Sequence, residues 1–289
     1  MIVSHSRRIG IALVLASAVL WSTAGPFVRM AGLDVWSILG WRSLFSVVVL
    51  GGWMLLRPGA ETRNLRFGLP GAILVALTVV ANATYIMALS WTSVANVMTV
   101  YATLPFVATA IAFLWLGDRV TMRFIIAGLM AFGGVCAMVG ASFSPADLRG
   151  IAAAAAMTLF FAAPLVVMRR YPNLDTLKMV TWAALCGMIV AVPLMPHDTL
   201  PSGQALLACA LYGVVTTGLG YILVLIGGRI VGAGEAGFLS MLDVVLGPLW
   251  MWIFFDETVS ATTLAGGATV LGAVLWYLSG GRRRTAAPA

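Results

Sequence analysis

The feature that most constrains this chain is a long stretch without charge, since no residue from 67 to 117 is acidic or basic. A helix that crosses the hydrocarbon core of a bilayer needs about 20 predominantly apolar residues. The stretch is long enough for two such helices, separated by a polar break at residues 90–93 (Ser-Trp-Thr-Ser). Because 61% of the chain is hydrophobic and only 9% is charged, the composition excludes a soluble domain and indicates a membrane protein.

Charged residues and clusters of Gly, Pro and Ser divide the chain into ten apolar segments. With a rise of about 1.5 Å per residue, each segment can cross a hydrocarbon core of about 30 Å. The sequence therefore predicts an all-α membrane protein with ten transmembrane helices. The expected spans are roughly 9–28, 35–56, 67–89, 94–116, 124–143, 150–168, 179–195, 203–226, 236–255 and 259–278.

The basic residues fall almost entirely on one side of this arrangement. With the N-terminus in the cytoplasm, the outer loops contain only Arg29 and Arg149, while Arg42 lies inside a span. The positive-inside rule accounts for this asymmetry and for the net charge of +7 without any nucleic acid. We therefore expect a multi-pass protein of the inner (plasma) membrane with both ends in the cytoplasm. The basic residues expected inside are Arg7, Arg8, Arg57, Arg63, Arg66, Arg119, Arg123, Arg169, Arg170, Lys178, Arg229, Arg282, Arg283 and Arg284.

The two halves of the chain repeat each other at a shift of 139 residues, which pairs Asp118 with Glu257 and Trp21 with Phe160. The loop that follows the fourth span keeps its acidic residue in the second copy but loses both arginines, including Arg119. Each half holds five expected spans, and because five is odd the second half must enter the membrane from the opposite face. Inverted repeats of this kind are typical of secondary transporters.

This organisation divides the chain into three expected parts. They are a first repeat over residues 1–143, a second, inverted repeat over residues 148–281 and a basic cytoplasmic tail over residues 282–289. The first span also resembles a signal peptide, because Arg7 and Arg8 precede an apolar run with small residues at 16–18. Cleavage there would leave the first helix of the second repeat without its counterpart.

The turn that follows the fourth span matches a family signature. Pro105 lies thirteen residues before Asp118, Gly117 precedes that acidic residue, and glycines follow in the next helix at the family's spacing. With these residues the chain resembles the drug/metabolite transporter superfamily, of the type built from two EamA domains. The resemblance covers nearly the whole chain. The second repeat departs from it, because Val244 occupies the proline position and Asp256 the position of the turn glycine.

The aromatic-rich interior also resembles the YddG type of amino-acid exporter. That resemblance implies export of aromatic and other neutral amino acids through a central cavity, by alternating access of the two halves. The sequence contains neither a GxxxxGK loop nor metal-ligand spacing, so we expect no ATP hydrolysis, no cofactor and no metal. The expected partners are the lipid bilayer and a small amino-acid-like substrate, with a functional monomer.

Two other classes of function are weighed against this one. An integral membrane enzyme needs clustered acids, histidines or metal ligands, whereas the acids are scattered and His5 and His197 lie near a terminus and in a loop. The alternative within the superfamily is a proton-coupled exporter of drugs or other metabolites. A glutamate in the first helix would favour it, and that span contains no acid. Efflux of lipophilic cations through Asp243 is the second hypothesis.

Polar groups inside a bilayer are costly and are therefore candidates for substrate binding. Asp243 lies near the middle of the ninth span, with Ser240 on the same helix face. It suits amine binding or proton coupling, and the alternative is a structural carboxyl bonded to a hydroxyl or to Arg42. Arg42 itself could bind a substrate carboxylate, or else extend toward the membrane surface or pair within the bundle.

Two polar stripes and a group of aromatic residues complete the predicted site. Thr78, Asn82 and Tyr85 form one stripe on the third span, and Thr217 and Tyr221 form its counterpart on the eighth. The stripes would line two vestibules, unless they only bond neighbouring helices. An aromatic pocket is also expected, with filler in the helix bundle as the alternative. Its members are Trp21, Tyr101 and Phe160.

Overall fold

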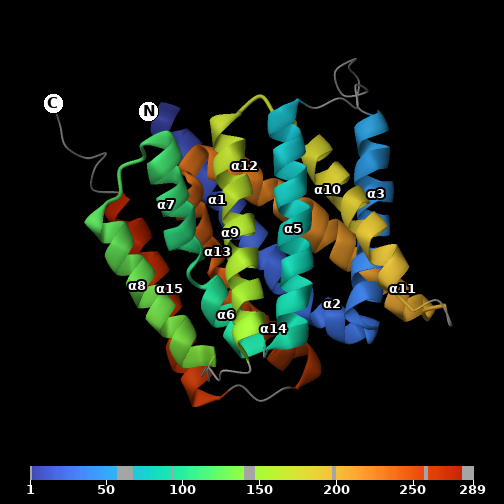
Figure 1. Cartoon of the computed structure of the whole chain (residues 1–289). Helices are drawn as coiled ribbons and strands as arrows, with labels where there is room; N and C mark the ends of the chain where they lie inside the picture. Colours follow the sequence, from blue (N-terminus) through green and yellow to red (C-terminus); the bar gives the residue numbers. More distant parts are fainter. Residues whose placement is uncertain are drawn as a thin grey trace.

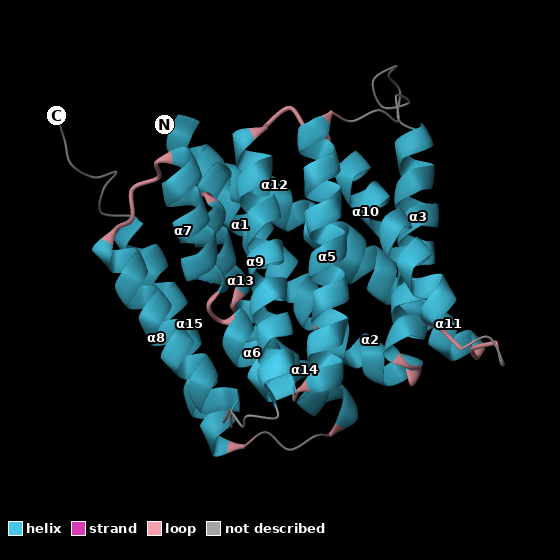
Figure 2. Cartoon of the chain, in the orientation of Figure 1, coloured by secondary structure: helices cyan, strands magenta, loops and turns pink. Residues whose placement is uncertain are grey.

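A computed structural model describes residues 2–56, 68–92, 94–139, 147–196, 200–256 and 260–281. All regular elements of this part of the chain are helices, as Figure 2 shows, so the all-α membrane fold is confirmed. The elements are α1 (Ile2–Ser22), α2 (Ala24–Ala31), α3 (Val35–Leu56), α5 (Leu69–Trp91), α6 (Val94–Tyr101), α7 (Leu104–Leu116), α8 (Met122–Val139), α9 (Leu148–Arg170), α10 (Thr176–Ala191), η2 (Val192–Leu194), α11 (Gly203–Leu211), η3 (Tyr212–Gly220), α12 (Tyr221–Val231), α13 (Ala233–Ser240), α14 (Leu242–Phe255) and α15 (Ala261–Gly281).

Eight helical segments of the described chain are long and apolar enough to cross a membrane, judged by length and composition. Some of these segments combine consecutive elements, such as Ser6–Ala31 and Gly203–Val231. Two further apolar helices, Leu69–Tyr85 and Met122–Met138, are shorter and coincide with the third and fifth expected spans. The number of ten transmembrane helices therefore stays a prediction.

Two of the spans are interrupted at equivalent positions in the two halves. A turn at Ala102 and Thr103 separates α6 from α7, and a turn at Met241 separates α13 from α14. Ala102 and Met241 are related by the same shift as the repeats. Pro105 explains why α7 starts where it does, because proline lacks an N–H and is tolerated in the first turn of a helix. Irregular backbone within a membrane is found only where it is buried in protein or lines a cavity.

Glycines bring the last helices of the two halves, α8 and α15, into close contact. A Cβ atom added to Gly266 would lie 2.3 Å from the carbonyl oxygen of Gly134, so the two backbones touch at this point. The other contacts follow the sequence repeat. α1 packs on α12 as α9 packs on α5, while α3 and α10, like α8 and α15, are counterparts that pack on each other.

Figure 1 shows at which end of the bundle the connections lie. The beginning of α1 and the α7–α8 connection lie at one end, whereas the end of α14 lies at the other. Asp118 belongs to the α7–α8 connection and Asp256 follows α14, and the inverted arrangement of the two repeats stays a prediction. We call the first end the basic face, after the residues Arg7, Arg119 and Arg169 that gather there.

Candidate functional site

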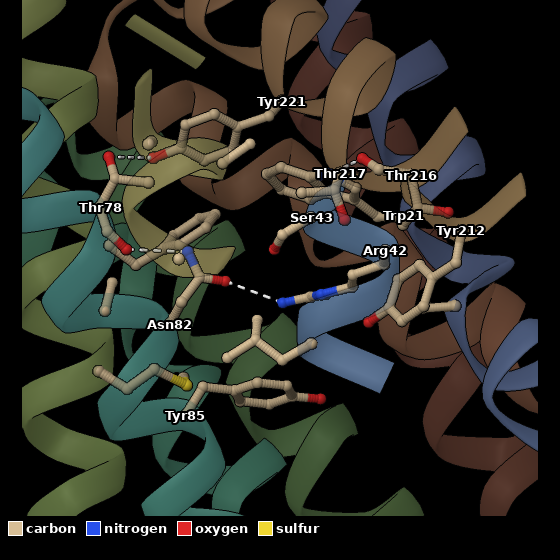
Figure 3. A pocket seen from close by; sticks show the side chains of 18 of the residues that line it. Trp21, Arg42, Ser43, Thr78, Asn82, Tyr85, Tyr212, Thr216, Thr217 and Tyr221 are labelled. Atoms are coloured by element: carbon tan, nitrogen blue, oxygen red, sulfur yellow. Dashed lines mark hydrogen bonds between the residues drawn. The ribbon is translucent and has the colours of Figure 1, made fainter. Parts of the chain in front are cut away.

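A central cavity of about 200 Å³ is lined by both halves of the chain. The first half contributes α1, α2, α3, α5 and α6, and the second contributes α9, α10, η3, α12 and α14. Both helix breaks reach the cavity, because Tyr101 is the last residue of α6 and Asp243 is the second residue of α14. Figure 3 shows the part of the wall that carries Arg42, Asn82 and most of the hydroxyl groups.

An aromatic cluster forms one side of the cavity, with Phe161 at its centre. The ring centroid of Phe161 lies 5.3 Å from that of Trp21, 5.8 Å from that of Tyr221 and 6.0 Å from that of Tyr101, all in edge-to-face geometry. Aromatic rings prefer such arrangements because the positive edge of one ring meets the negative face of another. The cluster presents a preformed apolar surface to a solute.

Two residues predicted from the sequence do not line the cavity. Phe160 was chosen as the repeat counterpart of Trp21, but its neighbour Phe161 occupies the wall, because adjacent residues of α9 point in different directions. Ser240 was placed on the face of Asp243 by helical spacing. The turn at Met241 ends that helix, and the Ser240 hydroxyl instead donates to the carbonyl of Ala236 at 2.9 Å.

The remaining predicted residues come together around a chain of hydrogen bonds, which Figure 3 shows. The hydroxyl oxygens of Thr78 and Tyr221 are 3.2 Å apart. The amide of Asn82 donates to the carbonyl of Thr78 at 2.8 Å, and its Oδ1 accepts from Nη2 of Arg42 at 3.1 Å. Hydrogen bonds between helices are also what the alternative to substrate binding predicts. The presence of these bonds alone therefore does not assign a substrate contact.

Arg42 is buried, with 7% of its surface exposed, and it is held on two sides. Asn82 accepts from one edge of the guanidinium, and the ring of Tyr212 lies 4.8 Å from its Cζ atom, a cation–π distance. Its backbone is anchored by Ser46, whose hydroxyl lies 2.9 Å from the carbonyl oxygen of Arg42 and 2.6 Å from that of Gly213. Arg42 therefore points into the cavity and does not extend toward the membrane surface.

The π-helix η3 supplies cavity residues that the sequence analysis missed, chiefly Tyr212 and Thr216. In a π-helix the bonds close between residues five apart, so Tyr212 and Thr217 come to the same wall. The Trp21 indole donates to the carbonyl of Thr216 at 3.1 Å and so ties α1 to η3. Regular helical spacing counted from Thr217 and Tyr221 does not predict Tyr212 and Thr216 as cavity residues.

Two ion pairs join the halves at the basic face. Arg7 of α1 pairs with Glu235 of α13, and Asp118 of the α7–α8 connection pairs with Arg169 of α9. Around them lies a second cavity of about 320 Å³, whose lining includes Tyr277 of α15. Each pair therefore ties a residue of the first half to a residue of the second.

The two halves of the chain each match the same family of known proteins. The sequence pattern of the EamA-like transporter family fits residues 8–140 and, a second time, residues 148–279. The chain belongs to this family. The superfamily assignment with two EamA repeats is thus confirmed, and this EamA protein is a multi-pass membrane transporter and not an enzyme.

Relatives of this EamA protein span nearly its whole length. An uncharacterized transporter of Archaeoglobus fulgidus is 29% identical over 272 residues, which cover 93% of this chain and 96% of that protein. A Streptantibioticus cattleyicolor protein named "Probable terminal-alkyne amino-acid exporter" is 25% identical over 290 residues, with 95% of each chain covered. A crystal structure of a protein 20% identical in sequence has a TM-score of 0.82 and covers 97% of this chain and 98% of the other; it shows the shared fold alone.

Proposed function

We propose that this EamA protein is a secondary transporter of the YddG type, which exports neutral and above all aromatic amino acids through the central cavity. The observation that carries the proposal is the wall of that cavity, an aromatic cluster around Phe161 combined with a few polar groups such as Arg42 and Asn82. Sites for small molecules are usually apolar with a few placed polar groups. The relative from Streptantibioticus cattleyicolor is named as a probable exporter of terminal-alkyne amino acids, which supports amino acids as the substrate class.

Transport would proceed by alternating access of two inverted halves. The ion pairs Arg7–Glu235 and Asp118–Arg169 both join one half to the other at the basic face. Separating the halves at that face would break both pairs, and closing the opposite end would then enclose the solute. The helix breaks beside the cavity give each half a point at which the backbone can bend.

The energy source would be either proton exchange at Asp243 or the solute gradient alone. Asp243 lines the cavity, and its Oδ1 has no hydrogen-bond partner among the described residues. The substitution Asp243→Asn removes the titratable group with little change in shape. If protons are exchanged there, this variant should lose any dependence of transport on an imposed pH gradient. A dependence equal to that of the unaltered protein would assign coupling elsewhere.

The same carboxylate in the cavity wall favours one rival function, the efflux of lipophilic cations. A panel assay separates the two. Purified protein in liposomes would be tested for uptake and efflux of aromatic amino acids, small neutral amino acids and a lipophilic cation, with protein-free liposomes as the control. We expect aromatic amino acids to exchange fastest. Transport of the cation without any amino acid would replace the proposed function with its rival.

A further inference from the structure

Two opposite charges line the central cavity, and neither has a counter-ion among the described residues. The Nε atom of Arg42 and the Oδ1 atom of Asp243 also lack any hydrogen-bond partner in that part of the chain. An unpaired charge inside a membrane protein is costly, because neither lipid nor apolar side chains replace the lost water. A ligand that carries both charges would satisfy the two groups together.

Arg42 is oriented so that part of its guanidinium remains free. The Asn82 amide donates to the carbonyl of Thr78, so the oxygen of that amide, and not its NH2 group, faces Arg42. The ring of Tyr212 lies beside the Arg42 side chain (Figure 3), with its centroid 4.8 Å from Cζ. Of the five N–H donors of an arginine, the Nε–H of Arg42 has no partner among the described residues. Two parallel N–H groups form a fork that matches a carboxylate.

Asp243 is placed by the break between α13 and α14. Because α14 starts after Met241, Asp243 lies in the first turn of a helix, where the helix dipole favours a negative charge. Asp243 and Arg42 both line the same cavity, together with Tyr85, so the two charges face one space. A carboxylate in this position can accept hydrogen bonds from an ammonium group.

We propose that the cavity recognises the zwitterionic backbone of an α-amino acid, with Arg42 on the α-carboxylate and Asp243 on the α-ammonium. The inference rests on the proposed function and deepens it, because the charged backbone and not the ring alone is then selected. The aromatic cluster around Phe161 receives the side chain. The volume of about 200 Å³ is below the ~300–1,000 Å³ of pockets for drug-sized ligands, which favours a compact solute.

Three probes with the same ring test this recognition. L-Phenylalanine carries both charges, phenethylamine lacks the carboxylate, and 3-phenylpropionate lacks the ammonium. Binding to the purified protein is measured by tryptophan fluorescence, and transport by competition with labelled L-phenylalanine in liposomes. Arg42→Gln should weaken L-phenylalanine roughly 10- to 100-fold, the usual effect of losing a charged hydrogen bond, and leave phenethylamine unchanged. Asp243→Asn should weaken L-phenylalanine equally and leave 3-phenylpropionate unchanged.

Two further variants serve as controls for this test. Arg123→Gln alters an arginine of α8 that bonds Trp276 outside the cavity, so it should leave all three affinities unchanged. Arg42→Lys keeps the charge without the fork and should recover part of the lost affinity; together with Asp243→Asn it carries the test if Arg42→Gln does not fold. An equal loss of all three probes in Arg42→Gln, or no loss, would overturn the inference alone. An unaltered protein that binds and transports no amino acid would overturn the proposed function as well.

Discussion

A single methyl group added at Gly213 should loosen the anchor of Arg42. A Cβ atom there would lie 2.1 Å from the carbonyl oxygen of Arg42, 2.9 Å from its carbonyl carbon and 3.0 Å from the hydroxyl of Ser46. Ordinary van der Waals contact begins at 3.4 Å. Because the obstructing atoms belong to the backbone of α3 and not to a flexible side chain, α3 and η3 would have to separate in Gly213→Ala.

The size of the effect follows from three contributions. Overpacking of this kind costs about 1–3 kcal/mol. Separation also weakens the hydrogen bonding of Ser46, which bridges the carbonyl oxygens of Arg42 and Gly213, and losing one such bond costs about 1 kcal/mol. Alanine in place of glycine inside a helix recovers up to about 1 kcal/mol. The expected net loss in the free energy of unfolding is therefore about 1–3 kcal/mol.

Thermal unfolding of the purified protein in detergent measures this loss, and L-phenylalanine binding measures its effect on the site. Gly213→Ala should lower the unfolding midpoint and weaken binding, because the carbonyl that fixes Arg42 has moved. Gly133→Ala in α8 is the matched control, since a Cβ atom at Gly133 would meet no heavy atom within 4 Å. Its midpoint should be unchanged or higher. Equal midpoints for the two variants would refute the reasoning.

Three further predictions concern other parts of the molecule. Gly266→Val should lower the unfolding midpoint, because the carbonyl of Gly134 leaves no room for a side chain; an unchanged midpoint would contradict the close contact of α8 and α15. Glu235→Gln should break the pair with Arg7 and make a cysteine introduced into the cavity wall more accessible from the basic face. Because the Arg7 side chain is 40% exposed, the increase in accessibility should be at most about fivefold. No increase would show that this pair does not hold the basic face closed. Tyr101→Ala should reduce transport of aromatic amino acids more than that of small neutral ones, whereas equal losses would show that Tyr101 only packs.

The fold was predictable because it depends on local properties of the chain. Apolar length marks a span, and the repeat shift of 139 residues relates the helix breaks at Ala102 and Met241. The shift was less reliable for single side chains. The first span breaks at Thr23 whereas its counterpart α9 is continuous, so the two helices are not exact copies. Phe161, and not the repeat counterpart Phe160, packs beside Trp21.

The π-helix limits prediction for a similar reason. Helical spacing of 3.6 residues per turn groups Thr217 with Tyr221, and both line the cavity, whereas Tyr212 lies at the start of the wider π-helix η3, which that spacing does not predict. Close packing against α3 explains why a glycine stands near the start of η3. Gly213 has no side chain, and its backbone rests on Arg42. Such a contact depends on two helices that are far apart in the sequence, so no local sequence pattern predicts it.

Two positions of the cavity wall are duplicated between the halves. Thr78 and Thr217 are repeat counterparts, as are Asn82 and Tyr221, and all four residues line the cavity. The duplicated positions carry neutral groups, and the hydroxyls of Thr78 and Tyr221 contact each other between the two halves. They are therefore suited to holding two equivalent halves together while those halves move.

The two charges do not follow this symmetry. Arg42 corresponds to Thr181 in the other half and Asp243 to Leu104, and neither counterpart lines the cavity. If a charged residue were repeated in both halves, the wall would carry the same charge on both sides and would favour ions of one sign. A wall with one cation from the first half and one anion from the second instead aligns a dipolar solute in a single direction. Under the proposed recognition, the repeated helices carry out the movement of transport. Arg42 and Asp243, which have no charged counterparts in the other half, determine which solutes are oriented in the cavity.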